Sequence, residues 1–301
     1  MSANNILKYV LITPARNEEA FIEQTIESVV KQTVRPLRWV IVSDGSTDRT
    51  DDIARKYAAQ HGWIVFVRMP ERRERHFAGK VGSFNAGCER LKELQYDVIG
   101  NLDADISFDE GYFEFLLGKL AQDSRLGVVG TPFSESGKTY DFRFSSLDHV
   151  SGACQMFRRE CFEAIGGYVP VKGGGIDVIA VLSARMRGWR TQTFPEKTCM
   201  HNKPMGSAAY GHKLMAEFRL GQRQYRLGFH PLWQLFRSAY QMTRKPYVMG
   251  GAALFLGYFQ SMLLGVERPV SLELVQFQRR DQMRRLRSFV GLGAGQKLAS
   301  K

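Results

Sequence analysis

The sequence predicts an α/β fold in which a mainly parallel sheet is flanked by helices. Three observations support this prediction. Short apolar segments alternate with longer amphipathic ones through the first third of the chain. The apolar segments are hydrophobic at nearly every position, which is typical of parallel strands buried on both faces. Polar clusters follow them directly, as at the ligand-binding edge of an open α/β sheet.

The elements alternate strictly along the chain. In the amphipathic segments, apolar residues recur at the spacing of one helix face. The predicted strands cover 8–15, 38–46, 63–69 and 97–105, and the predicted helices 18–33, 47–60 and 80–94. Thr47 or Asp48 is expected to cap the second helix, because a short side-chain oxygen can accept from its free amides.

Charge divides the chain into two parts. The formal charge of +12 comes from 42 basic and 30 acidic residues, and residues 203–301 hold 16 of the basic and only 4 of the acidic ones. We therefore expect an α/β domain over 1–205 and a helical, basic and hydrophobic extension over 206–301. Such asymmetry indicates a polyanionic or membrane-surface partner for the second part.

The four cysteines are scattered and form no C-x-x-C pair. This spacing favours neither a disulfide framework nor a zinc site, and it is typical of a protein in a reducing cytosol. The first ten residues, "MSANNILKYV", have neither the charged nor the apolar region of a signal peptide.

Asp103 and Asp105 end an apolar run in "NLDADISF". Side chains at i and i+2 share one face of a strand, so the two carboxylates are expected to point the same way. They then repel each other, and one keeps its proton unless a cation lies between them. Mg²⁺ or Mn²⁺ relieves that repulsion and binds carboxylates together with substrate phosphates. The alternative is a solvated turn in which Asp105 or Asp109 caps the next helix.

Five segments together resemble family 2 glycosyltransferases of the GT-A fold, a Rossmann-like nucleotide-sugar-binding domain. They are "TPARNEEAFIEQTIESVVKQT", "VIVSDGSTDRTDDIARKY", "GKVGSFNAG", "NLDADI" and "GACQMFRRECFEAIGGY", in family order across roughly 8–190. The resemblance implies an inverting enzyme that takes its sugar from a nucleotide-diphospho-sugar, with UDP favoured. It also implies that Asp103 and Asp105 hold the metal and the donor diphosphate, with Asp103 near the ribose.

The resemblance assigns the nucleoside end to Pro14, Glu18 and Asp44. Asp44 matches the family residue that accepts a hydrogen bond from the base, and its carboxylate suits a uracil N–H. Two residues depart from the family pattern. Arg16 stands where the family usually has an aromatic residue, and Ser43 stands where it has a second Asp. Glu19 and Asp48 are interpreted as helix N-terminal charges.

Three further residues are expected at the donor. Lys80 and Asn85 resemble a Lys–Asn spacing found at the nucleotide in related enzymes, and a lysine there provides a point charge for the leaving group. His201 resembles a downstream histidine that completes the metal shell or contacts the diphosphate, and an imidazole suits Mn²⁺ better than Mg²⁺. Lys203 adds positive charge beside it. A solvated Lys80 and a structural His201 are the alternatives.

Asp177 follows the glycines Gly173–Gly175 and opens an amphipathic segment over 178–187. The resemblance makes it the general base for the acceptor hydroxyl, although Ile176 stands where the family usually has Glu. General-base catalysis contributes about 10²–10⁴-fold. The alternative is that Asp177 caps the helix.

Residues 247–266 form an uncharged run that is long enough to cross a bilayer. Basic residues flank it, with Arg244 and Lys245 before it and an arginine cluster at 279–287 after it. One crossing from the cytosol would export that cluster, against the positive-inside tendency. We therefore expect a re-entrant or interfacial hairpin at anionic headgroups on the cytoplasmic face of the bacterial inner membrane. A true span and a buried core helix remain alternatives.

An enzyme at a bilayer is expected to use a lipid-linked or glycan acceptor, as in cell-surface or exopolysaccharide synthesis. A nucleic-acid partner is not expected, because the sequence shows no nucleic-acid-binding motif. Two other functions remain open. Nucleotidyl transfer would need a basic Gly-rich loop after the first strand, where the chain has "TPARNEE". A catalytically degenerate membrane-bound scaffold would account for Ser43 and Ile176.

Overall fold

The computed structural model describes residues 7–71, 77–135, 146–171, 173–203 and 213–289. The chain divides into two compact units, Met1–Met205 and Gly206–Lys301. The first is an α/β unit and the second is helical.

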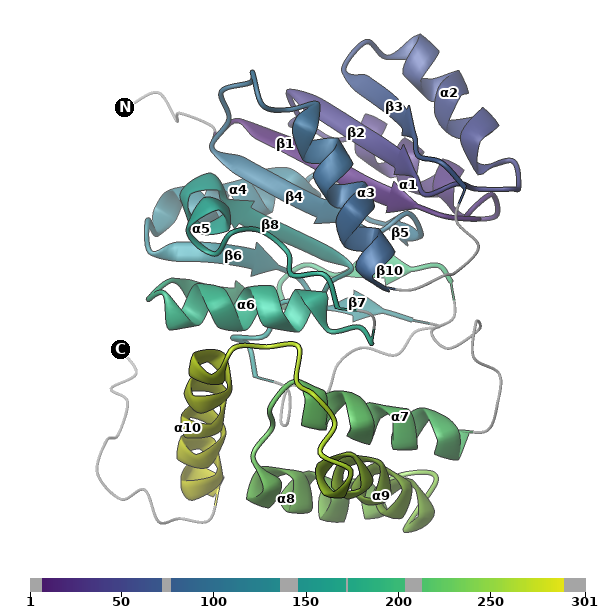
Figure 1. The fold of residues 1–301 in the computed structure, drawn as a ribbon. Helices are drawn as coiled ribbons and strands as arrows, with labels where there is room; N and C mark the ends of the chain where they lie inside the picture. Colours follow the sequence, from purple (N-terminus) through teal and green to yellow (C-terminus); the bar gives the residue numbers. More distant parts are fainter. Residues whose placement is uncertain (1–6, 72–76, 136–145, 172, 204–212, 290–301) are drawn as a thin grey trace. The chain divides into compact units, whose positions relative to one another are not determined.

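A seven-stranded sheet forms the centre of the first unit, with strand order β3-β2-β1-β4-β8-β6-β9 (Figure 1). Its strands are β1 (Tyr9–Ala15), β2 (Arg38–Ser43), β3 (Ile64–Arg68), β4 (Val98–Leu102), β6 (Leu126–Gly130), β8 (Cys154–Arg158) and β9 (Arg190–Thr193). The four predicted strands are all present and run parallel to one another. β8 is antiparallel to both of its neighbours, so the sheet is mainly, not wholly, parallel.

Helices cover both faces of this sheet, as predicted. They are α1 (Ile22–Val30), α2 (Thr50–Gln60), α3 (Phe77–Glu89), α4 (Tyr112–Gln122), α5 (Arg159–Ala164) and α6 (Ile176–Met186). In Figure 1, α3, α5 and α6 lie on one face, and α1 and α4 on the other. α1 begins four residues later than predicted, because the Glu18 carbonyl first accepts from the amides of Phe21 and Ile22 in a turn. At α2, the Asp48 carboxylate accepts from the Thr50 amide at 3.0 Å.

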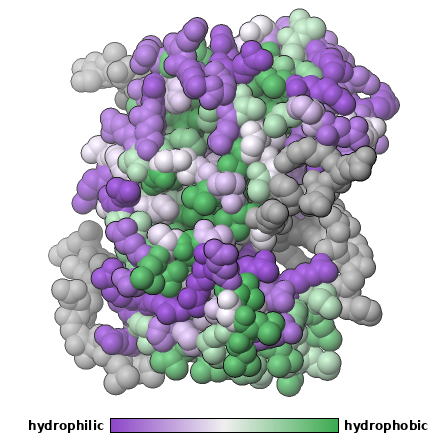
Figure 2. All heavy atoms as spheres, in the orientation of Figure 1, coloured by the Kyte–Doolittle hydropathy of each residue, from purple (hydrophilic) through white to green (hydrophobic). Residues whose placement is uncertain are grey.

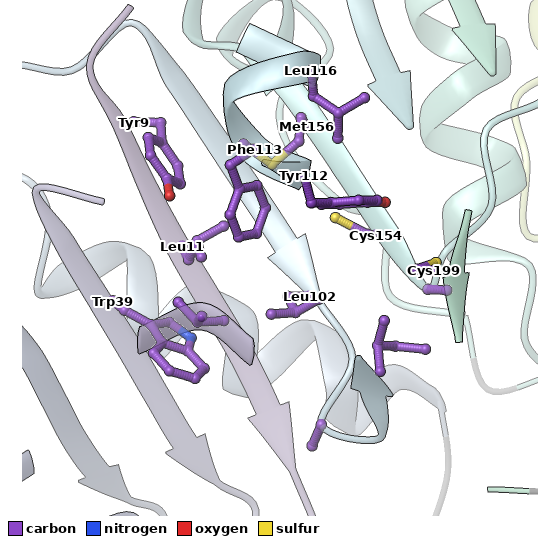
Figure 3. Close-up of a cluster of buried hydrophobic side chains, with 14 of the residues drawn as sticks. Tyr9, Leu11, Trp39, Leu102, Tyr112, Phe113, Leu116, Cys154, Met156 and Cys199 are labelled. Atoms are coloured by element: carbon purple, nitrogen blue, oxygen red, sulfur yellow. The ribbon is translucent and has the colours of Figure 1, made fainter. Parts of the chain in front are cut away.

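The hydrophobic core on the α4 side joins the strands that lead to the polar edge (Figure 3). Tyr9 of β1 and Phe113 of α4 pack with ring centroids 5.1 Å apart. Trp39 of β2 is fully buried, and its indole N–H donates to Thr13 of β1 at 2.9 Å. Each buried side chain of this size contributes about 1.5–3 kcal/mol. The core therefore holds β1 and β2 firmly, and with them the residues at their ends.

A second, three-stranded sheet lies beyond the end of β4. It has the order β5-β10-β7 and consists of β5 (Ile106–Ser107), β7 (Phe133–Ser134) and β10 (Cys199–His201). β10 runs antiparallel to β5, with His201 opposite Ile106. This pairing brings a segment from late in the unit back to the aspartates that follow β4.

The second unit consists of α7 (Lys213–Arg226), α8 (Pro231–Met242), α9 (Met249–Leu263) and α10 (Leu272–Phe289). α9 packs against its neighbours through glycines. A Cβ at Gly257 would lie 2.0 Å from the Phe218 carbonyl oxygen of α7, and one at Gly251 would lie 2.3 Å from the Ser238 carbonyl oxygen of α8. Within the apolar run 247–266, Met249–Leu263 form one helix, so the run does not fold back on itself as the predicted hairpin would, whereas its place at a membrane stays a prediction.

The other face of α9 is apolar and exposed. Met249, Leu256 and Leu263, which recur every seven residues, are 61%, 57% and 83% exposed. Figure 2 shows hydrophobic residues gathered on the surface over this helix. Within the described ranges, no helix combines the length and the apolar character that crossing a bilayer requires.

Candidate functional site

Three strand ends meet at one edge of the seven-stranded sheet. β1, β2 and β4 are adjacent and parallel. The residues that directly follow them are Arg16, Asp44 and Asp103. Because parallel strands end at the same edge of a sheet, the polar clusters after these strands converge there, as the sequence predicts.

The aspartate pair lies just beyond β4. The strand ends at Leu102, so Asp103 and Asp105 lie in the following turn and not on the strand itself. They are nevertheless neighbours. Burial, followed by the negative charge of Asp103, raises the pKa of Asp105 to about 6. The side chain of Asp105 is thus buried beside a like charge, which is the condition under which a cation is favoured.

His201 lies beside this pair. Its Nε2 is 3.8 Å from Oδ2 of Asp105. Its Nδ1 is 2.5 Å from the backbone carbonyl oxygen of Lys203. Because a carbonyl oxygen can only accept, Nδ1 donates, and Nε2 is the ring nitrogen on the side of Asp105. A metal-ligating histidine commonly makes such a hydrogen bond with its other ring nitrogen.

Asp103, Asp105 and His201 therefore offer two carboxylates and one imidazole. Among the residues that the structure describes, no three His, Cys, Asp or Glu side chains converge as a ready-made metal cluster. Mg²⁺ and Mn²⁺ do not need one, because they are commonly held by one or two carboxylates plus substrate phosphates. The donor set fits such an ion.

Lys80 lies at the centre of the site. It stands in the first turn of α3, and its ammonium forms an ion pair with the Asp103 carboxylate. Burial alone would lower its pKa, but the charges of Asp103, Asp177 and Asp105 outweigh burial and raise the pKa. One cation is thus influenced by the aspartate pair after β4 and by Asp177, which is far from that pair in the sequence.

Two ion pairs lie where the sequence predicts the nucleoside end of the site. Nη1 of Arg16 is 3.7 Å from Oδ2 of Asp44. Glu18, which is only 8% exposed, accepts from Nζ of Lys203 at 2.7 Å. The segment after β10 is thereby connected to the loop after β1.

Two further residues predicted at the donor, Pro14 and Asn85, lie within a strand and a helix. Pro14 lies within β1, half-buried and opposite Val42 of β2. Asn85 is exposed on α3, five residues after Lys80. At 3.6 residues per turn the two point about 140° apart around the helix axis, so the structure does not bring Asn85 and Lys80 to one face.

Asp177 is the second residue of α6, and Gly175, with φ of 91°, is the residue before the helix. The alternative that Asp177 merely caps the helix is therefore wrong. Its carboxylate packs beside Gly152, where an added Cβ would lie 3.1 Å from Oδ2. Asp177 is half-buried and contributes to the raised pKa of Lys80, so it belongs to the same site.

Sequence reasoning missed two buried amides near the site. Asn101 of β4 donates to the Gly152 carbonyl at 3.1 Å. Gln155 of β8 is fully buried and lies close to Asp177. Both stand alone among apolar residues within a strand, and such a polar residue is the signal that could have singled them out.

The sequence model described as Glycosyl transferase family 2 matches residues 10–165. The chain is 26% identical over 203 residues to the poly-beta-1,6-N-acetyl-D-glucosamine synthase of Staphylococcus aureus (strain COL), covering 61% of this chain and 47% of that protein. It is 29% identical over 133 residues to the uncharacterized glycosyltransferase EpsJ of Bacillus subtilis (strain 168), covering 43% and 36%. The chain thus spans less than half the length of these curated relatives.

Two solved structures show the same fold. The mannosyltransferase PcManGT from Pyrobaculum calidifontis, in complex with GDP-Man and Mn²⁺, superposes with a TM-score of 0.59 at 19% identity, covering 97% of this chain and 82% of that one. Residues 1–349 of S. aureus TarS, in complex with UDP-GlcNAc, superpose with a TM-score of 0.54 at 15% identity, covering 90% and 78%.

Proposed function

Because the chain belongs to glycosyl transferase family 2 and is a glycosyltransferase of the GT-A fold, we propose that it is an inverting enzyme that uses a nucleotide-diphospho-sugar, with UDP as the favoured nucleotide. The observation that supports this proposal is the grouping of charged side chains beyond β4, where the Lys80 ammonium pairs with the Asp103 carboxylate and Nε2 of His201 lies 3.8 Å from Oδ2 of Asp105.

The nucleoside lies at the edge formed by Arg16, Glu18 and Asp44. The Asp44 carboxylate accepts the N–H of the base, and a base without that N–H does not form this hydrogen bond. Uracil offers one such N–H between two carbonyl oxygens, and the Arg16 guanidinium beside Asp44 can donate to a carbonyl oxygen. This pattern supports UDP as the favoured nucleotide.

The donor diphosphate lies between the aspartate pair and Lys80. Asp103, Asp105 and His201 would hold a divalent ion, and a bound ion would supply positive charge beside the diphosphate. The Lys80 ammonium adds a second positive charge at the same place. Both act on charge that develops as the bond to the sugar breaks, so they favour the transition state over the ground state.

Asp177 acts on the acceptor side. Its carboxylate removes the proton from the acceptor hydroxyl while that oxygen forms a bond to the anomeric carbon. The bond between that carbon and the diphosphate oxygen breaks on the opposite side, and the nucleoside diphosphate leaves. Attack opposite to the leaving group inverts the anomeric configuration.

The acceptor is a lipid-linked or surface glycan, and the enzyme works at the cytoplasmic face of a bacterial membrane. Three features support this part of the proposal. The second unit carries most of the excess positive charge. One face of α9 is apolar and exposed. The similar S. aureus protein makes a poly-N-acetylglucosamine.

A donor screen tests the proposal. UDP-, GDP- and dTDP-sugars are each added with Mn²⁺, and the melting temperature and the release of nucleoside diphosphate are both measured. A true donor at 100 times its Kd stabilises the protein by about 2.7 kcal/mol. We expect one UDP-sugar to stabilise it and to be turned over only with metal. Binding without turnover would indicate a scaffold, and pyrophosphate release from UTP and a sugar phosphate would indicate a nucleotidyltransferase.

A further inference from the structure

Gln155 is the buried side chain that connects the segments on either side of Asp177. Its Nε2 donates to the Val150 carbonyl oxygen at 3.0 Å and, in a longer bond of 3.4 Å, to the Asp177 carbonyl oxygen. The first partner precedes Gly152, which packs against the Asp177 carboxylate, and the second belongs to the first turn of α6. The two N–H groups of the Gln155 amide thus set the spacing between Gly152 and the Asp177 carboxylate.

Tyr168 fixes the orientation of that amide. Its hydroxyl donates to Oε1 of Gln155 at 2.7 Å. Burial, followed by the nearby charge of Asp177, raises the pKa of Tyr168 well above its ordinary value, so the hydroxyl keeps its proton. With Oε1 held as an acceptor, Nε2 must face Val150 and Asp177.

The same cluster reaches the donor side. The Tyr168 ring packs edge-on against Phe84, with ring centroids 4.9 Å apart. Phe84 stands one helical turn after Lys80 on α3. On the other side, the Asp103 amide donates to the Ala153 carbonyl at 2.9 Å, two residues before Gln155. The lysine, the aspartate pair and Asp177 are therefore attached to one packed cluster.

We propose that Gln155 is a positioning residue that holds the first turn of α6 so that the Asp177 carboxylate faces the donor, and that Tyr168 keeps Gln155 in that role. The inference rests on the proposed function, in which Asp177 is the general base. A base displaced by about 1 Å can cost about 100-fold in rate, because the attacking oxygen and the reacting carbon must be aligned. The donor contacts are made by other side chains, so we expect donor binding to depend on Gln155 much less than kcat does.

The test compares Q155M, Y168F and the double variant with a control, Y9F. Methionine keeps the length of glutamine but cannot donate. Tyr9 is a fair match for Tyr168, because it is also buried and its hydroxyl donates to the Val34 carbonyl at 2.7 Å, at the start of β1. Each Tyr→Phe change removes one buried hydrogen bond, and only one of them acts near Asp177.

For each variant, kcat is measured with the donor found in the screen, and donor Kd is measured by calorimetry. We expect Q155M to lower kcat about 10- to 100-fold and Y168F about 3- to 10-fold. Donor Kd stays within about twofold, and Y9F has the kcat of the wild type. The double variant is no slower than Q155M, because the Tyr168 hydroxyl acts through the amide. If Q155M and Y168F lose no more kcat than Y9F, or if donor binding weakens as much as kcat, the inference is wrong.

A second measurement does not depend on turnover. A water-soluble carbodiimide labels accessible carboxyl groups, and peptide mass spectrometry gives the labelling rate of Asp177. Q155M and Y168F should raise that rate several-fold, and Y9F should leave it unchanged. If the wild type transfers no sugar but the labelling changes as expected, the proposed function fails while the placement of Asp177 by Gln155 stands. If labelling does not change, Gln155 does not position Asp177.

Discussion

Nζ of Lys203 lies 2.7 Å from Oε1 of Glu18, although 185 residues separate them in the sequence. The Glu18 carboxylate is almost fully buried, so removing the lysine takes an ion pair away from a charge that has little contact with water. We expect K203M to lower the free energy of unfolding by about 1–3 kcal/mol, measured by urea denaturation. K197M is the control, because Lys197 pairs with Asp109, whose side chain is 57% exposed, and such a surface pair contributes less than about 1 kcal/mol. Equal losses of unfolding free energy in K203M and K197M would show that the buried pair contributes no more than the surface pair.

The raised pKa of Asp105 predicts how the stability of the metal-free protein depends on pH. Burial and Asp103 raise this pKa from 3.8 to about 6, Glu18 adds to the shift, and His201 and Lys203 oppose it. The native state thus holds the proton more tightly than the unfolded chain. The proton on Asp105 therefore stabilises the fold fully below about pH 4, and this stabilisation is lost as the pH rises through about 6.

D105N cannot ionise and therefore avoids that loss. In EDTA, we expect D105N to be more stable than the wild type by about 1–3 kcal/mol at about pH 7.5, and to match it only below about pH 4. Thermal denaturation across this pH range is the measurement. Added Mn²⁺ should raise the melting temperature of the wild type and not that of D105N. A stability difference that does not vary with pH would contradict the raised pKa.

Replacing Asp177 separates the chemical step from donor binding. Asparagine has nearly the same size but cannot accept the acceptor proton, so D177N should lower kcat by about 10²–10⁴-fold. Donor Kd, measured by calorimetry with Mn²⁺, should not change, because the donor is held by other residues. D52N is the control, since the Asp52 side chain is 76% exposed on α2. Loss of donor affinity in D177N would place Asp177 among the donor-binding residues instead.

The parallel strands could be predicted because their signal is local. Four apolar segments, each followed by polar residues, became β1 to β4, and the aspartates after β4 lie beside Lys80 as part of one edge. The three-stranded sheet that carries His201 could not be predicted in the same way. Its strands are two or three residues long, which is too short for a periodicity, and their pairing depends on the rest of the fold.

The buried amides show a second limit on what the sequence can predict. Gln155 stands in "CQMFR", where the residues around it predict a buried strand, so a polar side chain there needs internal partners. The sequence can indicate that such partners exist, but it does not say which they are. Val150 and Tyr168 are near in sequence, whereas Asp177 comes 22 residues later on another element. Only the position of α6, which packs against β6 and β9 of the same sheet, identifies it.

The exposed face of α9 makes the membrane proposal testable. The helix has 15 residues and is about 22 Å long, shorter than the roughly 30 Å of a bilayer core, so we expect it to lie in the membrane surface. Vesicles of phosphatidylcholine with about 30% phosphatidylglycerol should bind the protein more strongly than phosphatidylcholine alone, because exposed Arg244 and Lys245 directly precede the helix.

Charge placed on that face should abolish binding to these vesicles. L256E and L263E each remove an inserted side chain worth about 1.5–3 kcal/mol, so each should weaken sedimentation with vesicles by at least about tenfold. Both residues are more than half exposed, so the variants should keep the melting temperature of the wild type. The control is L37E, at a position 43% exposed in the α/β unit, which should bind as the wild type does. If L256E and L263E bind normally, α9 does not contact the lipid, and if they instead convert a dimer into a monomer in gel filtration, the face is covered by a second copy of the chain.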